Sequence, residues 1–190
     1  MKKILIFASG SGSNAERIAT YFAEKGTAQV SLILSNNFQA GVLERAKRLN
    51  IAALVFNREA FYKREVVLNI IKTEQPDLIV LAGFLWKVPT YLTDAYPKQI
   101  VNIHPSLLPK YGGKGMYGSH VHEAVIANGE KESGISIHYV NEHYDEGNII
   151  FQAKTTVLPT DTADSLAEKI HSLEYEHFPK VIEKVLNISI

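Results

Sequence analysis

Two polar side chains stand together at the end of an apolar run in the sequence VNIHPSLLPKYGG, residues 101–113. Asn102 and His104 alternate with β-branched residues, so in an extended strand both polar side chains point to the same side. Pro105 keeps His104 out of helical geometry. An amide and an imidazole placed side by side can both offer N–H donors to one oxygen atom. This spacing favours a catalytic role for the pair over a purely structural one.

A carboxylate that could assist this pair lies in the segment NEHYDEGNII, residues 141–150. Asp145 stands two residues before Gly147, between two apolar runs. A solvated hairpin turn is enough to explain most polar residues of this segment, and the D-x-G pattern also suits an ordinary turn. A contact between Asp145 and His104 would give the carboxylate a chemical role, and only the fold decides whether that contact exists.

A Gly/Ser-rich turn, ASGSGSNAER at residues 8–17, follows the first apolar run. Gly10, Gly12 and Ala15 match the dinucleotide pattern G-x-G-x-x-A. The acidic residue that this pattern requires about 20 positions later is replaced by the polar, uncharged residues 35–37. Two interpretations remain at this point. The segment is either a tight turn between a strand and a helix, or a site for one phosphate group at a helix N-terminus.

Composition limits the class of protein. The 190 residues suffice for one domain with a buried core. The 20 basic residues balance the 20 acidic ones, which disfavours nucleic acid as the main partner. The chain has no cysteine, so disulfides, thiolate nucleophiles and thiolate metal sites are excluded, and His120 and His122 make no convincing metal set. No apolar run approaches the roughly 20 residues that span a bilayer. We therefore expect a soluble protein, and the absence of cysteine is compatible with a reducing cytoplasm.

The secondary-structure pattern predicts how these residues are positioned. Short apolar runs predict strands at 3–8, 30–35, 52–56, 78–82 and 100–103. Helical patterns alternate with them at 14–25, 40–49, 58–74, 90–96 and 119–128. Extended runs at 134–140 and 148–157 come next, and a final helix runs from about Asp161 to Leu186. This order predicts a single doubly wound α/β domain, a mostly parallel sheet with helices on both faces and an antiparallel C-terminal extension. Ligands then bind at the carboxyl ends of the strands.

Taken together, these motifs resemble the folate-dependent formyltransferases, and within them the branch that acts on glycinamide ribonucleotide. The resemblance runs along the whole chain, through SGSGSN, LERAKRLNI, DLIVLAGF, NIHPSLLPKY and ISIHYVNEHYDEGNIIFQ. It implies one formyltransferase domain over 1–190, with a nucleotide-binding half at about 1–100 and a catalytic, folate-contacting half at about 80–190. It implies transfer of a formyl group from 10-formyltetrahydrofolate to the glycinamide amine in purine synthesis, without a metal, by a monomer or weak homodimer.

The resemblance also implies roles for individual residues. The catalytic residues would be Asn102, His104 and Asp145, with Asn102 and a protonated His104 stabilising a tetrahedral intermediate and Asp145 assisting. The substrate phosphate and ribose would be bound by Gly12, Ser13, Asn14 and Glu174. Without the resemblance, Glu174 is the edge of an apolar stripe in the last helix. The folate would be bound by Arg58, Leu85, Trp86, Lys87, Val88 and Asn102, with Arg64 as the alternative arginine.

The sequence departs from its relatives at two places, Leu85-Trp86 where many carry Met-Arg, and the longer loop 111–118. Two alternative functions stay open. An amino-sugar nucleotide formyltransferase would share the N-x-H-P signature but has no reason to carry the SGSGSN turn. A non-catalytic nucleotide-binding module would keep that turn, yet would not need Asn102, His104 and Asp145 together.

Overall fold

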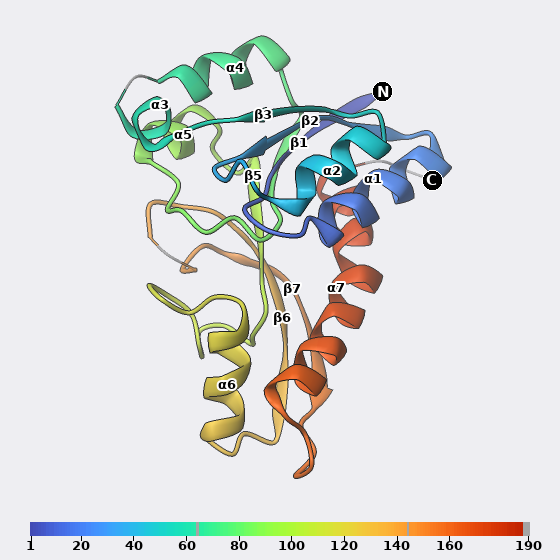
Figure 1. Cartoon of the computed structure of the whole chain (residues 1–190), viewed down its shortest axis with the longest axis vertical. Coiled ribbons are helices and arrows are strands. Elements are labelled where there is room, and N and C mark those ends of the chain that lie inside the picture. Colours follow the sequence, from blue (N-terminus) through green and yellow to red (C-terminus); the bar gives the residue numbers. More distant parts are fainter. Residues whose placement is uncertain (64, 144, 188–190) are drawn as a thin grey trace.

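The computed structural model describes residues 1–63, 65–143 and 145–187. The strands are β1 (Lys2–Phe7), β2 (Ala28–Ser35), β3 (Ala52–Val55), β4 (Leu78–Leu81), β5 (Ile100–His104), β6 (Glu132–Tyr139) and β7 (Ile149–Thr156). The helices are α1 (Ser13–Lys25), α2 (Gly41–Arg48), α3 (Arg58–Tyr62), α4 (Val66–Glu74), α5 (Thr90–Ala95), α6 (Ser119–Ala127) and α7 (Ala163–Val185). Their arrangement is shown in Figure 1.

The described strands form one seven-stranded sheet in the order β3-β2-β1-β4-β5-β6-β7. The pairs from β3 to β5 are parallel, and β6 and β7 are antiparallel to their neighbours. This confirms the predicted doubly wound domain with an antiparallel extension. The strand order reverses between β1 and β4, which makes their carboxyl ends the expected place for a ligand.

Both faces of the central part of the sheet are buried. Along β1, Ile4 and Ile6 belong to one apolar cluster, whereas Leu5 and Phe7 belong to the cluster on the opposite face. Successive side chains of a strand point to opposite faces, so a continuous apolar run is what a sheet covered on both sides requires. The first cluster includes residues of α1, α2 and α7, and the second includes residues of α4 and α5.

The predicted helix at 58–74 is wrong in one respect, because two helices, α3 and α4, occupy this range. The side chain of Asn57 caps α3 by accepting the Ala60 N–H. Glu65, immediately before α4, has a backbone φ of +49°, outside helical geometry. Phe61 is fully buried against Phe7 and Phe56. The end of α3 thus carries a residue that packs against distant segments of the chain. No local sequence signal indicates this packing.

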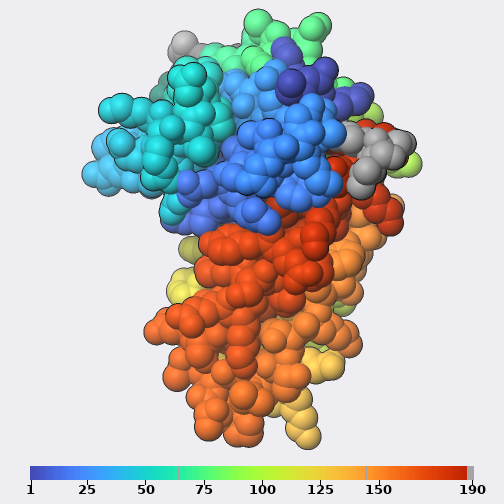
Figure 2. Space-filling view, turned by 90° about the vertical axis from the view of Figure 1, so that its right-hand side faces the viewer, coloured from blue at the N-terminus to red at the C-terminus, as the bar shows by residue number. Residues whose placement is uncertain are grey.

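The last helix, α7, contacts both the N-terminal helix α1 and the C-terminal strands β6 and β7. Thr162 and Ser165 form a capping box at its start, close to the predicted position. The helix packs against α1, α6, β6 and β7, and Figure 2 shows it in red beneath the blue N-terminal segment. Glu174 is thereby brought beside the start of α1. Among the described residues, none of the helices combines the length and apolarity needed to cross a membrane.

Candidate active site

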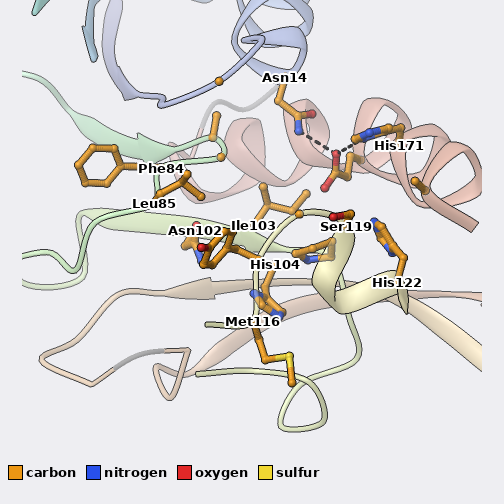
Figure 3. A pocket seen from close by; sticks show the side chains of 18 of the residues that line it. Asn14, Phe84, Leu85, Asn102, Ile103, His104, Met116, Ser119, His122 and His171 are labelled. Carbon is orange, nitrogen blue, oxygen red and sulfur yellow. Dashed lines mark hydrogen bonds and ion pairs between the residues drawn. The ribbon is translucent and has the colours of Figure 1, made fainter. Parts of the chain in front are cut away.

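A pocket of about 630 Å³ opens at the carboxyl ends of β1, β4 and β5. Its walls are the turn before α1, the segment 82–85, the end of β5, the Gly-rich loop 113–118, and parts of α6 and α7. Figure 3 shows Asn102 and His104 on one side of this space and Asn14 and His171 on another. The pocket therefore brings together all three polar regions that the sequence singled out.

Asn102, His104 and Asp145 meet in this pocket. The imidazole Nδ1 of His104 lies 3.6 Å from Oδ2 of Asp145, and Nδ2 of Asn102 lies 3.5 Å from Oδ1 of the same carboxylate. His104 is buried, and the Asp145 side chain is 12% exposed. The structure thus brings Asp145 within reach of His104, and a turn that is merely solvated would not hold its carboxylate there.

The protonation state of His104 follows from its burial. Burial lowers the pKa of the His104 imidazole below its ordinary value, although Asp145 and the Tyr111 carbonyl act in the opposite direction. This lowered pKa favours a neutral His104 imidazole at pH 7. Its Nε2 lies 2.7 Å from the Tyr111 carbonyl oxygen. Because a carbonyl only accepts hydrogen bonds, Nε2 carries the proton and Nδ1, facing Asp145, is left basic.

The segment that carries Asp145 is held in an uncommon conformation. Asp145 has a φ of +54°, and its Oδ2 accepts the N–H of Gly113 at 2.8 Å. Burial raises the pKa of its carboxyl, but His138, His104 and the Gly113 N–H together bring that pKa below its ordinary value. Asp145 is therefore charged. The D-x-G glycine has a steric role, because a Cβ on Gly147 would lie 1.6 Å from the Tyr139 carbonyl oxygen.

The opposite end of the pocket is built from the start of α1 and the middle of α7. Gly12 caps α1 with a φ of +77°, and a Cβ there would lie 2.4 Å from a methyl group of Val42. The glycine therefore allows α1 to begin close to α2, and residues Gly10 to Asn14 line the pocket at this point. Asn14 donates to the buried Glu174 at 2.9 Å, which explains the polar residue within the apolar stripe of α7.

Two histidines beside Glu174 were missed by sequence reasoning. Nδ1 of His171 lies 3.0 Å from Glu174 Oε2, and this contact raises the pKa of His171 despite partial burial (Figure 3). His122 is buried in the same wall, and burial lowers its pKa. Their spacing along the chain carries no signal, because α6 and α7 meet only in the fold. Within the described residues, no group of three or more metal-ligating side chains is placed to hold an ion.

Comparison with known proteins decides the family. Residues 2–182 match the formyl transferase family. The chain belongs to that family. Phosphoribosylglycinamide formyltransferase of Bacillus subtilis is 34% identical over 194 residues, covering 100% of this chain and 97% of that protein. The chloroplastic phosphoribosylglycinamide formyltransferase of Arabidopsis thaliana is 37% identical over 95% of this chain, which spans 64% of the plant protein's length.

Solved structures agree with the family and the fold. Glycinamide ribonucleotide transformylase 1 from Symbiobacterium toebii superposes with a TM-score of 0.90 at 31% identity, covering 98% of this chain and 88% of that one. Phosphoribosylglycinamide formyltransferase from Bacillus halodurans gives a TM-score of 0.89 at 36% identity, with 98% and 96% covered. The whole described sheet of this formyl transferase, including the antiparallel extension, is therefore a family feature.

Only some of the residues expected to bind folate line the pocket of this formyl transferase. Leu85 lines the pocket together with Asn102, and its backbone N–H donates to the Ser9 hydroxyl. Trp86, Lys87 and Val88 lie outside the pocket lining, and Val88 is buried in the core. The exposed Arg58 places its guanidinium 5.1 Å from the centre of the Trp86 ring. Arg64, the alternative arginine, lies outside the described residues.

A third histidine of this formyl transferase contacts the central group and was also missed. His138 of β6 is directly opposite Asn102 of β5, and its Nε2 lies 3.1 Å from the Asn102 amide nitrogen. In the sequence it is one polar residue within an alternating strand, ISIHYV. Only the register between β5 and β6 identifies it as a neighbour of the site.

Proposed function

We propose that this formyl transferase moves the formyl group of 10-formyltetrahydrofolate to the amine of 5-phosphoribosylglycinamide in purine biosynthesis. The observation that carries the proposal is the shared pocket. At one end Asn102, His104 and Asp145 surround a space for a reacting carbonyl, and at the other a helix N-terminus is suited to a phosphate. Two bacterial relatives are named phosphoribosylglycinamide formyltransferase, which supports formyl transfer to this acceptor.

The nucleotide would bind at the α1 and α7 end. Gly12, Ser13 and Asn14 would hold the phosphate with backbone N–H groups, the Ser13 hydroxyl and the positive end of the helix dipole. Glu174 would accept hydrogen bonds from the ribose hydroxyls. His171, whose pKa is raised by Glu174, adds a positive charge beside this region below that pKa. This arrangement supplies both a cation and oriented donors for a dianionic group.

The formyl donor would bind at the other end. Leu85 and Asn102 line the pocket there and would contact the reacting part of the folate. Trp86, Lys87 and Val88 continue the same segment, and Arg58 rests on the Trp86 ring. We place the anionic tail of the folate near this arginine, because a guanidinium is a preferred partner for carboxylates. This chain's aromatic residue at position 86 would then act by holding Arg58.

The chemical step uses the substrate's own nucleophile. The amine nitrogen bonds to the formyl carbon, the bond from that carbon to the donor nitrogen breaks, and one amine proton passes to the leaving nitrogen. The Asn102 amide N–H would stabilise the oxygen of the tetrahedral intermediate. Neutral His104 has its basic Nδ1 available for the proton, and the imidazolium that results can donate to the same oxygen. Charged Asp145 stabilises that imidazolium.

The proposal extends to where and how the protein works. We infer one functional domain over 1–190, with nucleotide binding in about 1–100 and catalysis with folate contacts in about 80–190. The proposed step uses only protein side chains and the two substrates, and it requires no metal. We expect small-molecule substrates, a cytoplasmic location, and a monomer or weak homodimer.

One assay tests this function directly. The protein is incubated with glycinamide ribonucleotide and 10-formyltetrahydrofolate, and release of tetrahydrofolate is followed by absorbance. We expect turnover that requires both substrates. No turnover here, combined with turnover on an amino-sugar nucleotide, would assign the protein to the sugar-nucleotide reaction. Binding of nucleotide without any formyl transfer would leave a nucleotide-binding module.

A further inference from the structure

We infer that His138 is a positioning residue that fixes the side-chain amide of Asn102 with its N–H groups toward the reacting centre. The inference rests on the proposed function, since the reaction is what gives this amide its task. His138 does not line the pocket and lies on β6, directly across from Asn102 on β5. It acts through Asn102 and would not itself touch the substrates.

The tautomer of His138 is set by the backbone. Its Nδ1 lies 2.9 Å from the Tyr139 carbonyl oxygen, which can only accept, so Nδ1 carries the proton of the neutral ring. Nε2 is then left with a lone pair. The amide nitrogen of Asn102 lies 3.1 Å from His138 Nε2. His138 is therefore an acceptor for the Asn102 amide.

Two acceptors on the same side decide which way the amide faces. Asn102 Nδ2 lies 3.1 Å from His138 Nε2 and 3.5 Å from Asp145 Oδ1. With the amide reversed, its carbonyl oxygen would face a nitrogen lone pair and a carboxylate, and both contacts would be repulsive. One N–H is held by His138, and the second, which makes only the longer 3.5 Å contact with Asp145, is the one that would turn to the oxygen of the reacting formyl group.

A rival role for His138 is a cation that pairs with Asp145. Its Nε2 lies 3.6 Å from Asp145 Oδ1, longer than its distance to Asn102. His138 is 2% exposed, and its Nδ1 is hydrogen-bonded to the Tyr139 carbonyl oxygen, which leaves Nε2 as the acceptor for Asn102. The geometry thus favours the neutral acceptor, and the two roles make opposite predictions.

A double-mutant cycle separates the two roles. His138→Leu removes the acceptor and should lower kcat by about tenfold to 100-fold, as loss of a supporting partner commonly does, with little change in nucleotide KM. His138→Gln, which can still accept, should recover most of that loss. In an Asn102→Ala background, His138→Leu should change kcat by no more than about twofold. His177→Gln, on a histidine outside the pocket lining that contacts Phe151, is the control and should leave kcat unchanged.

Three outcomes would overturn the inference. The first is an unchanged kcat in His138→Leu. The second is a loss of kcat on adding His138→Leu to Asn102→Ala that equals its loss in the wild-type background. The third is a kcat of His138→Gln as low as that of His138→Leu. The last two are what a cation for Asp145 predicts.

A spectroscopic measurement keeps the test independent of activity and of variant folding. Proton–nitrogen NMR of the wild-type protein, at a pH well above the ordinary histidine pKa, should show His138 protonated at Nδ1 alone. In Asn102→Ala its Nε2 resonance should shift, because the amide donor is gone. A proton on Nε2, or an unshifted Nε2, would contradict the inference. Failure of the wild-type assay would instead count against the proposed function and would leave this measurement valid.

Discussion

The imidazole Nδ1 of His104 and the carboxylate Oδ2 of Asp145 lie 3.6 Å apart, on a strand end and on a loop that are distant in sequence. Because burial lowers the pKa of His104, the ring is neutral at rest and the two groups form an ion pair only once His104 has taken up a proton. The pair is thus better suited to stabilising a charge that appears during the reaction than to holding one beforehand.

This relationship predicts a pH dependence. The lowered pKa of His104 means that its basic form is present above that pKa and is lost as the pH falls through it. The acid limb of kcat/KM for the formyl donor, measured with saturating nucleotide, should therefore lie below the ordinary histidine value of about 6.5. Asp145→Asn removes a charge that raises this pKa, so the limb should move to lower pH while the plateau falls. A limb that moves to higher pH would contradict the assignment of His104 as the base.

Gly147 is predicted to be required for the position of Asp145. A methyl group at Gly147 would collide with the Tyr139 carbonyl, so Gly147→Ala must displace the loop. We expect a loss of about 1–3 kcal/mol in the free energy of unfolding, as overpacking commonly costs, together with a kcat at least about tenfold lower. Glu146→Ala, in an exposed neighbour on the same loop, is the matched control. Equal kcat values for the two variants would show that the loop position is unimportant.

The turn before α1 is predicted to affect nucleotide binding more than chemistry. Ser13 and Asn14 lie at the end of the pocket away from Asp145, and Asn14 also holds Glu174. Ser13→Ala and Asn14→Ala should each raise the nucleotide KM by more than they lower kcat, because the phosphate is bound equally in the ground and transition states. Steady-state kinetics with each substrate varied provides the measurement. An unchanged nucleotide KM in both variants would place the phosphate elsewhere.

His171 is predicted to make nucleotide affinity depend on pH. Its contact with Glu174 raises its pKa, so its positive charge is present below that raised value and disappears as the pH rises through it. The nucleotide KM should increase over this range, and the increase should be absent in His171→Gln. The KM for the formyl donor serves as the internal control and should not follow the same curve. A His171→Gln variant with the wild-type pH dependence would exclude the charge as its source.

The sheet could be predicted from sequence because its signals are local. Continuous Val, Ile and Leu runs, such as the one in β1, are what a strand buried on both faces requires. The division of 58–74 into α3 and α4 could not be predicted, because the range contains no glycine or proline to mark a break. The burial of Phe61 against Phe7 and Phe56 is a contact between distant segments, and local propensity does not report it.

Some residues of the site could likewise be predicted from the sequence, and others could not. Asn102 and His104 could be paired from sequence because alternate residues of one strand share a face. His138 and His171 reach the site through strand register and helix packing, so their positions in the sequence carry no indication of it. The charge state of His104 was also beyond sequence reasoning, because it depends on how deeply the ring is buried.

In the proposed reaction, Asn102 and His104 act on one developing oxyanion. Removing either donor alone, in Asn102→Ala or His104→Ala, should lower kcat by about 100-fold to 1,000-fold while the protein stays folded. The most direct measurement is kcat of the double variant. If both groups serve the same oxygen, the double variant should lose far less than the product of the single losses. A loss equal to that product would show that the two residues act independently, and would contradict the account.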